Sequence, residues 1–356
     1  MTTTAVPTHS RTSRWPDRLA PLAAGWLGLW GVLALLATVT GAGYPFGANE
    51  SRPSGASLLR LVPVEAGPPL FAGLLLTAAV AALAMSTVRP SGPLRAALLG
   101  YGWAAAFVLA VVVPDSTVLA TLGYAPMLLV GAPFGWPPVD YSEIFTWALF
   151  AKFAAVAGGV LLAGASLTFA RRTAGACLAC GRDGTDRGWT SAAAATRWGR
   201  WAAWTAAVIP FAYALTRFAW LVGIPLGLDP EFLDEMHRTG LVWAGFGLGA
   251  FATVGSVLTL GLVQRWGERF PRWLPGLAGR PVPVKLAVVP ATLVAVTVTA
   301  ASLGLFSVPG FWQLGGGFSA ASAPMLLWPL WGVALGAATY AYRLRRRGAC
   351  RGCGRA

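Results

Sequence analysis

The stretch Gly175-Ala-Cys177-Leu-Ala-Cys180-Gly181-Arg182 returns near the C-terminus as Gly348-Ala-Cys350-Arg-Gly-Cys353-Gly354-Arg355. These two stretches contain all four cysteines of the 356 residues. Each one follows an apolar segment that ends in clustered arginines. A sequence motif that is repeated in the same context indicates that the chain consists of two related halves.

Outside these two stretches, the chain is strongly apolar. Hydrophobic residues make up 56% of it and charged residues 11%, whereas an ordinary soluble domain has roughly 25% charged residues. Eight apolar runs approach the ~20 residues that a helix needs to cross a membrane. The runs are 20–42, 67–88, 96–113, 144–170, 201–223, 240–264, 286–308 and 324–342. The pattern predicts an all-α membrane protein with about eight transmembrane helices.

The distribution of basic residues predicts the orientation. Twenty-two of the 27 Lys and Arg residues fall in the five segments that are cytoplasmic if the N-terminus is inside, and three fall in the outer loops. Cytoplasmic loops carry the excess of Lys and Arg, so both termini are expected in the cytoplasm. Residues 1–19 form a polar N-terminal tail rather than a cleavable signal peptide.

The net charge of +14 and the pI near 10.8 do not indicate a nucleic-acid-binding protein. The positive charge is spread over five inner segments, which is typical of membrane topology signals and favours contact with anionic lipids. Membrane lipids are therefore the expected partners, and nucleic acid is not.

A division near residue 198 gives two four-helix repeats, 20–198 and 199–356, each ending in a Cys-x-x-Cys stretch. Gly43-Tyr-Pro45-Phe-Gly47 after the first run matches Gly223-Ile-Pro225-Leu-Gly227 after the fifth. Each half contains an even number of spans, so the two repeats are expected to be parallel rather than inverted.

The two Cys-x-x-Cys-Gly stretches have the form of zinc knuckles. Two residues between the thiolates let both sulfurs reach one ion, and the glycine after the second cysteine permits a tight turn. Together Cys177, Cys180, Cys350 and Cys353 predict one structural zinc site with four cysteine ligands on the cytoplasmic side, where structural disulfides are rare. Two alternatives remain, which are a redox-active thiol pair and separate free thiols.

Lys152 and Arg217 lie within predicted spans, in the outer half of the membrane. Charges at such depth usually face the bundle interior or a water-filled cavity. They predict an outward-facing site for an anionic small molecule or a lipid headgroup. Alternatively, each cation reaches the interface or pairs with an outer-face carboxylate, for which there are four candidates: Asp115, Asp140, Glu143 and Asp229.

Two outer segments and one inner segment have unusual composition. Residues 114–141 are apolar but interrupted by Gly and Pro, which fits either a re-entrant segment or an extracellular lid. The acids of 229–237 are expected to begin a short amphipathic helix, with a cation site at these acids and His237 as the alternative. In the inner loop 265–285, Trp and Phe alternate with basic residues, which favours an interfacial segment.

The segments Arg217-Phe-Ala-Trp220-Leu-Val-Gly223 and Gly261-Leu-Val-Gln264-Arg-Trp-Gly267 resemble uncharacterised multi-pass membrane proteins of high-GC actinobacteria. The resemblance covers about residues 200–310. It implies a bacterial inner-membrane protein and carries no activity or catalytic motif.

The sequence leaves three functional classes open. The first is a permease-like or lipid-interacting protein with Lys152 and Arg217 in its ligand site. The second is a membrane-embedded enzyme acting on a lipid or isoprenoid phosphate. The third is a docking or thiol-redox protein that presents its basic inner segments and cysteines to a cytosolic protein partner.

Overall fold

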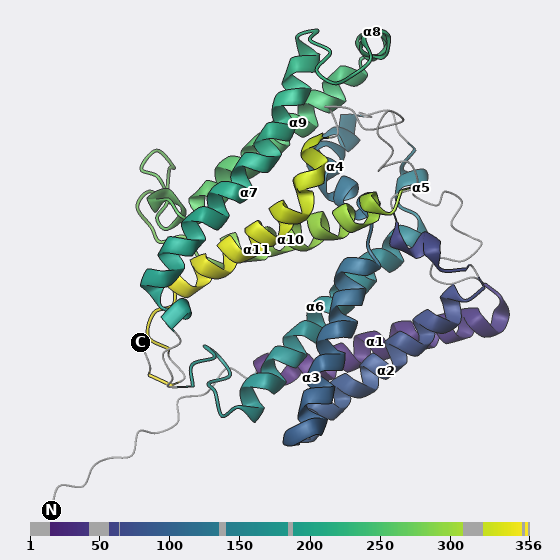
Figure 1. The fold of residues 1–356 in the computed structure, drawn as a ribbon, viewed down its shortest axis with the longest axis vertical. Helices are drawn as coiled ribbons and strands as arrows, with labels where there is room; N and C mark the ends of the chain where they lie inside the picture. The colour runs from purple at the N-terminus through teal and green to yellow at the C-terminus, as the bar shows by residue number, and fades with distance from the viewer. Residues whose placement is uncertain are drawn as a thin grey trace, which may run out of the picture.

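The computed structural model describes residues 15–42, 57–63, 65–134, 140–183, 188–308, 323–350 and 353–354. Within these ranges every regular element is a helix, and the one β-bridge, between Arg269 and Pro281, is isolated (Figure 1). Most of the N-terminal tail, the Gly43–Gly47 motif and Arg355 lie outside the described residues.

The first half of the chain forms a bundle of four helices, with a further helix beside it. The four are α1 (Trp15–Thr40), α2 (Gly67–Thr87), α3 (Gly92–Phe107) and α6 (Trp147–Thr173). A π-helical turn, η2 (Val108–Val112), prolongs α3. Helix α1 packs on α2 and α6, and α3 packs on α6. The other elements are η1 (Leu58–Leu61), α4 (Ser116–Gly131), η3 (Ala132–Phe134) and α5 (Tyr141–Ile144).

The second half also contains four long helices. They are α7 (Ala192–Leu221), α9 (Leu241–Gly261), α10 (Val284–Phe306) and α11 (Trp328–Arg345). Helix α7 packs on α9 and α11, and α10 packs on α11. The short helices are η4 (Gly188–Thr190), α8 (Pro230–Thr239), η5 (Arg265–Gly267) and η6 (Ala323–Leu327).

Helices occupy all eight predicted positions, but a count of eight spans is not confirmed. Six helices of the described residues are long and apolar enough to cross a membrane, or seven if α4 and η3 together count as one bent span. Helices α7 and α11 are not among the six. Helix α7 contains Arg197, Arg200 and Arg217, and α11 ends in Arg343 and Arg345.

Residues 192–200, predicted to lie in an inner loop, form the first turns of α7. The Ser191 side chain accepts a hydrogen bond from the Ala194 N–H and so caps the helix. Four alanines follow, and alanine has the highest helix propensity of all residues. The helix therefore begins before the apolar run predicted from 201, because capping and helix propensity, and not hydropathy, set its start.

The segment 114–141, for which the sequence predicted a re-entrant segment or a lid, begins with a helix. Asp115 caps α4, and the axis bends by 47° between Ser116–Ala125 and Met127–Phe134. The bend fits either a broken span or a re-entrant loop. The Gly135–Pro138 part of this segment lies outside the described residues.

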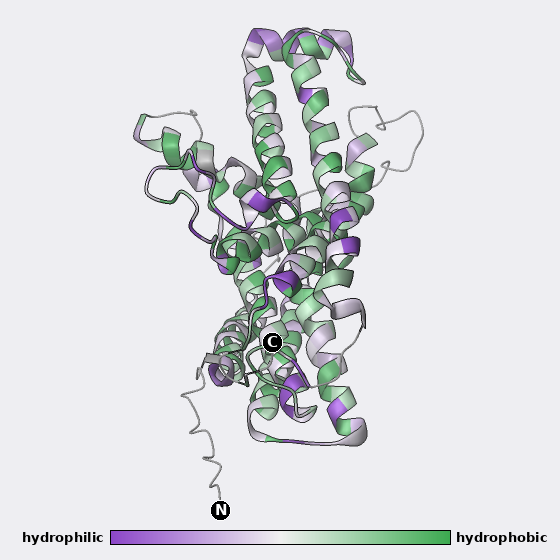
Figure 2. Ribbon diagram, turned by 90° about the vertical axis from the view of Figure 1, so that its left-hand side faces the viewer, coloured by the Kyte–Doolittle hydropathy of each residue, from purple (hydrophilic) through white to green (hydrophobic). Residues whose placement is uncertain are grey.

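Small residues line the helix contacts, while large apolar residues face outward. Gly159 of α6 lies against the backbone of Ala106 and Ala110, and such small residues let helices approach closely in membranes. Only 17% of the apolar stretch of α9 is buried. Hydrophobic residues predominate along the long helices (Figure 2), and many of the large ones are exposed. An apolar exterior of this extent is expected for helices that face lipid.

Among the described residues, the two halves meet mainly at two places. In the middle of the molecule α10 packs against α4 and η2, where Ala110, Val111 and Ala300 form a buried cluster. At one side the loop after α6 meets the tail after α11, far from α8 at the top of Figure 1. The second meeting place brings the four cysteines together.

Candidate metal centre

The two cysteine stretches fold into turns of the same kind. In the first, the Gly181 N–H donates to the Cys177 carbonyl oxygen at 2.7 Å, and Gly181 has a φ of +77°. In the second, the Gly354 N–H donates to the Cys350 carbonyl oxygen at 2.7 Å, and Gly354 has a φ of +69°. Only glycine adopts such angles at little cost. The expected role of the glycine after each pair is confirmed.

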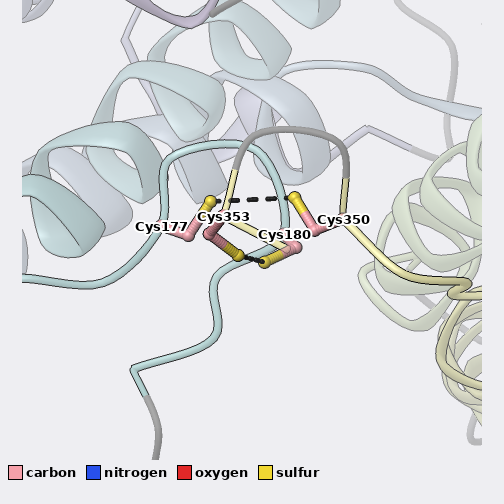
Figure 3. Close-up of side chains that lie close together, drawn as sticks. All are labelled: Cys177, Cys180, Cys350 and Cys353. Carbon is pink, nitrogen blue, oxygen red and sulfur yellow. Dashed lines mark hydrogen bonds between the residues drawn. The ribbon is translucent and has the colours of Figure 1, made fainter. Parts of the chain in front are cut away.

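The four cysteines form one compact group, called here the four-cysteine cluster (Figure 3). All four sulfurs lie within 4.8 Å of one another. The Cys177 and Cys350 sulfurs are 3.9 Å apart, and those of Cys180 and Cys353 are 3.6 Å apart. Each of these two close pairs joins a cysteine of the first half to one of the second, 173 residues further along the chain.

These distances fit a metal ion and not disulfides. A disulfide requires sulfurs about 2.05 Å apart. Four sulfurs at about 2.3 Å from one tetrahedral zinc ion lie about 3.8 Å from each other. The two close separations of 3.6 and 3.9 Å agree with this value, and the other sulfurs lie within 4.8 Å of one another. The four-cysteine cluster can therefore hold one metal ion between the two halves.

The surroundings of the four-cysteine cluster affect its thiols unequally. Burial opposes ionisation of Cys177, but hydrogen bonds from the backbone N–H groups of Cys180 and Ala179 outweigh it and lower the pKa of Cys177 to about 6. Burial raises the pKa of Cys180 to about 11. A metal ion binds thiolates, so binding at this cluster would displace the proton of Cys180.

Arginines hold the two cysteine turns against each other. Arg171 donates from Nη1 to the Leu178 carbonyl oxygen at 2.8 Å, inside the first turn. Arg182 of the first turn donates to the Gly348 carbonyl oxygen at 3.3 Å, and Arg347 beside the second turn donates to the Cys180 carbonyl oxygen at 3.4 Å. These bonds position the turns across the boundary between the halves.

Lys152 of α6 is 2% exposed and forms an ion pair. Its Nζ lies 2.8 Å from Oδ2 of Asp115, which is 1% exposed. The other carboxylate oxygen of Asp115 accepts the N–H of Thr117 at 3.0 Å and so caps α4. Lys152 thus has one of the carboxylate partners that the sequence offered as the alternative to a ligand.

Arg217 lies in the other half, on α7, and is 8% exposed. Its guanidinium carbon lies 4.2 Å from the ring centre of Tyr213 and 4.0 Å from that of Trp220. Its Nη1 donates to Oγ1 of Thr216 at 3.0 Å. Lys152 thus contacts Asp115, whereas Arg217 contacts side chains of its own helix α7. The two cations of the predicted ligand site therefore have different neighbours.

The acidic outer segment forms a helix, α8, as the sequence predicted. Asp229 caps it by accepting the N–H groups of Glu231 and Phe232. His237 donates from Nε2 to the Trp220 carbonyl oxygen at 2.9 Å. Among the described residues, the four cysteines are the group of His, Cys, Asp or Glu side chains that could hold a metal ion.

Sequence reasoning missed a cavity of about 360 Å³ beside the four-cysteine cluster. Arg95, Arg171, Arg343 and Arg347 line it together with Cys180. Burial lowers the pKa of Arg347. The sequence signal was the placement of these arginines at helix ends, which was attributed to membrane topology and to general attraction for anionic lipids and not to a cavity.

No protein-family model matches the chain, and neither a curated protein nor a solved structure shows significant similarity to it. The functional argument therefore depends on the site itself.

Proposed function

We propose that this chain is a permease-like or lipid-interacting protein of the bacterial inner membrane, in which a zinc ion clamps two helical halves together on the cytoplasmic side. Cys177, Cys180, Cys350 and Cys353 are the proposed ligands. One observation carries the proposal: two Cys-x-x-Cys turns from opposite halves bring four sulfurs within 4.8 Å of one another.

Zinc is the metal that this ligand set favours. Four cysteine thiolates in tetrahedral arrangement are typical of structural zinc sites, although iron–sulfur sites also use thiolates. Four protein ligands leave no open position for water or substrate, so the proposed ion has a structural role. A cytoplasmic location would keep the four thiols reduced and available to it.

We further propose that the halves arose by duplication and are arranged in parallel. Equating α1, α2, α3 and α6 with α7, α9, α10 and α11 makes three helix contacts correspond. The contact of α1 with α2 matches that of α7 with α9, α1 with α6 matches α7 with α11, and α3 with α6 matches α10 with α11. Parallel halves related by an axis along the membrane normal are found in several transporter families, which supports the permease-like class.

The proposed metal is tested on the full-length protein purified in detergent without added zinc. We expect about one zinc ion per chain by elemental analysis, and no thiol that reacts with a thiol reagent until the protein is denatured. The Cys177→Ser/Cys350→Ser variant should lose the zinc. Four reactive thiols in a metal-free folded protein would contradict the clamp and favour the thiol-redox alternative.

A further inference from the structure

The cavity beside the four-cysteine cluster lies where three helix ends of the two halves converge. Arg95 comes from the first turn of α3, Arg171 from the last turn of α6, and Arg343 from the last turn of α11. The first cysteine turn, at Cys180 and Gly181, forms a further wall. The cavity therefore exists only where both halves and the cysteine turn meet.

The lining of the cavity carries an excess of positive charge. Four arginines face one carboxylate, that of Asp183, among its lining residues. Arg172 pairs with Asp17 and Arg345 with Glu268, and neither of these two arginines lines the cavity. Crowded guanidinium groups repel one another, so an anion in the cavity would relieve that repulsion.

The arginines retain donors for such an anion. Arg95 donates from Nε to Thr173 Oγ1 at 2.7 Å, and the Arg171 and Arg347 bonds to carbonyl oxygens described above each use one nitrogen. A guanidinium group has five N–H donors in a planar fork. The fork matches the oxygens of a phosphate group, which it binds through paired hydrogen bonds.

The rest of the lining is apolar and aromatic, as at the depth of lipid headgroups. Leu167 and Leu344 form part of the wall, beside Tyr340. The Tyr340 ring lies 6.2 Å from that of Trp189 and 6.4 Å from that of Trp198. Tryptophan and tyrosine are enriched at the level of the headgroups. Basic cavities between helices at the cytoplasmic surface are suited to anionic lipid headgroups.

We propose that this cavity binds a phosphate group, and that its source is the headgroup of an anionic phospholipid which bridges the two halves beside the four-cysteine cluster. The proposal rests on the proposed clamp, because the cysteine turn forms one wall of the cavity. The phosphate would contact α3 and α6 of the first half and α11 of the second. The lipid would therefore reinforce the junction that the metal holds.

A competing explanation is that the arginines serve only to balance the thiolates. Four thiolates and one zinc ion carry a formal charge of −2, and Arg171 and Arg347 contact the first cysteine turn directly. Replacing Arg95 and Arg343 can distinguish the two explanations. Arg95 bonds to Thr173 and Arg343 is exposed at the end of α11, and both line the cavity.

Native mass spectrometry of the full-length protein in detergent separates these explanations, because zinc and lipid are read on the same ions. The probes are dioctanoyl phosphatidylglycerol, dioctanoyl phosphatidylcholine and inorganic phosphate. The test variant is Arg95→Gln/Arg343→Gln. The matched control is Arg197→Gln/Arg200→Gln, which removes two exposed arginines of α7 that do not line the cavity.

We expect phosphatidylglycerol to bind more tightly than phosphatidylcholine, and the test variant to weaken its binding roughly 10- to 30-fold with zinc retained. The control should bind as the wild type does. If inorganic phosphate binds in an arginine-dependent way and the lipid is not preferred, the cavity is still a phosphate site. The source of the phosphate group is then free phosphate. Equal binding by test and control variants would overturn the proposal, even if zinc is present. Arginine-dependent lipid binding without zinc would overturn only the clamp.

Discussion

At the scale of single residues, Lys152–Asp115 is more buried than the other ion pairs of the described residues. A charge placed in the membrane interior is costly unless a partner neutralises it. Asp115 has a second role because it caps α4. The pair therefore fixes the start of α4 against the first turns of α6, and so positions the segment that packs on the second half.

Replacing Lys152 by methionine should destabilise the protein by on the order of 3–5 kcal/mol, because the Asp115 carboxylate would stay buried without its cation. Lys152→Met/Asp115→Asn should recover much of that loss, since Asn still caps a helix well. Lys285→Met, which removes an exposed lysine, is the matched control and should have little effect. Thermal unfolding in detergent measures all three. A stable Lys152→Met protein would show that the pair is not structural.

The surroundings of the two cations were predictable to different degrees. Tyr213 and Trp220 flank Arg217 at i−4 and i+3, and helical spacing alone places them on its face. The partner of Lys152 was harder, because four outer carboxylates were candidates. Selecting Asp115 requires knowing that α4 begins beside α6, and this contact depends on the path of the chain between them.

At the scale of elements, the length of the apolar runs predicted where the helices lie. It did not predict where each helix begins or how it continues. The start of α7 depends on Ser191 and the alanines after it, which a hydropathy pattern ignores. The π-helical turn Val108–Val112 is invisible in a uniformly apolar run. The sequence also does not show where two helices approach closely, because a glycine does not reveal which residues of the neighbouring helix lie against it.

Gly159 illustrates such an approach and can be tested. A Cβ atom there would lie 2.9 Å from the Ala106 carbonyl oxygen and 2.9 Å from the Ala110 nitrogen, both in the backbone of the neighbouring helix. Gly159→Ala should therefore cost about 1–3 kcal/mol of stability, despite the better helix propensity of alanine. Gly100→Ala on α3 is the matched control, because nothing lies within 4 Å of its added Cβ. Equal thermal stability of both variants would show that α3 and α6 can separate freely.

At the scale of the whole molecule, the repeated Cys-x-x-Cys motif predicted that two distant segments meet. The structure brings their four sulfurs together. Hydropathy could not predict how the halves are joined elsewhere. The contact of α10 with α4 and η2 depends on a bent helix and a π-helical turn. The cavity beside the cysteines was equally hidden, because its arginines come from three different helices and the tail that follows α11.

These two junctions should respond differently to removal of the metal. The buried cluster of Ala110, Val111 and Ala300 joins the halves independently of the cysteines, whereas the loop after α6 and the C-terminal tail meet through the four-cysteine cluster and a few hydrogen bonds. A strong zinc chelator should therefore leave the helix content nearly unchanged, as measured by far-ultraviolet circular dichroism. It should greatly accelerate tryptic cleavage at Arg182 and Arg347, because local opening exposes a chain that the metal had held.

Added zinc should restore protection in the wild type but not in Cys177→Ser/Cys350→Ser, which lacks two of the proposed ligands. Cleavage at Arg238, on the distant helix α8, should be insensitive to the chelator and is the internal control. Loss of helix content on chelation would instead mean that the clamp maintains both bundles. Unchanged cleavage at Arg182 and Arg347 would mean that the hydrogen bonds alone hold the cysteine turns together. The proposed outcome requires a metal that acts at one end of the molecule, while apolar packing continues to hold its middle.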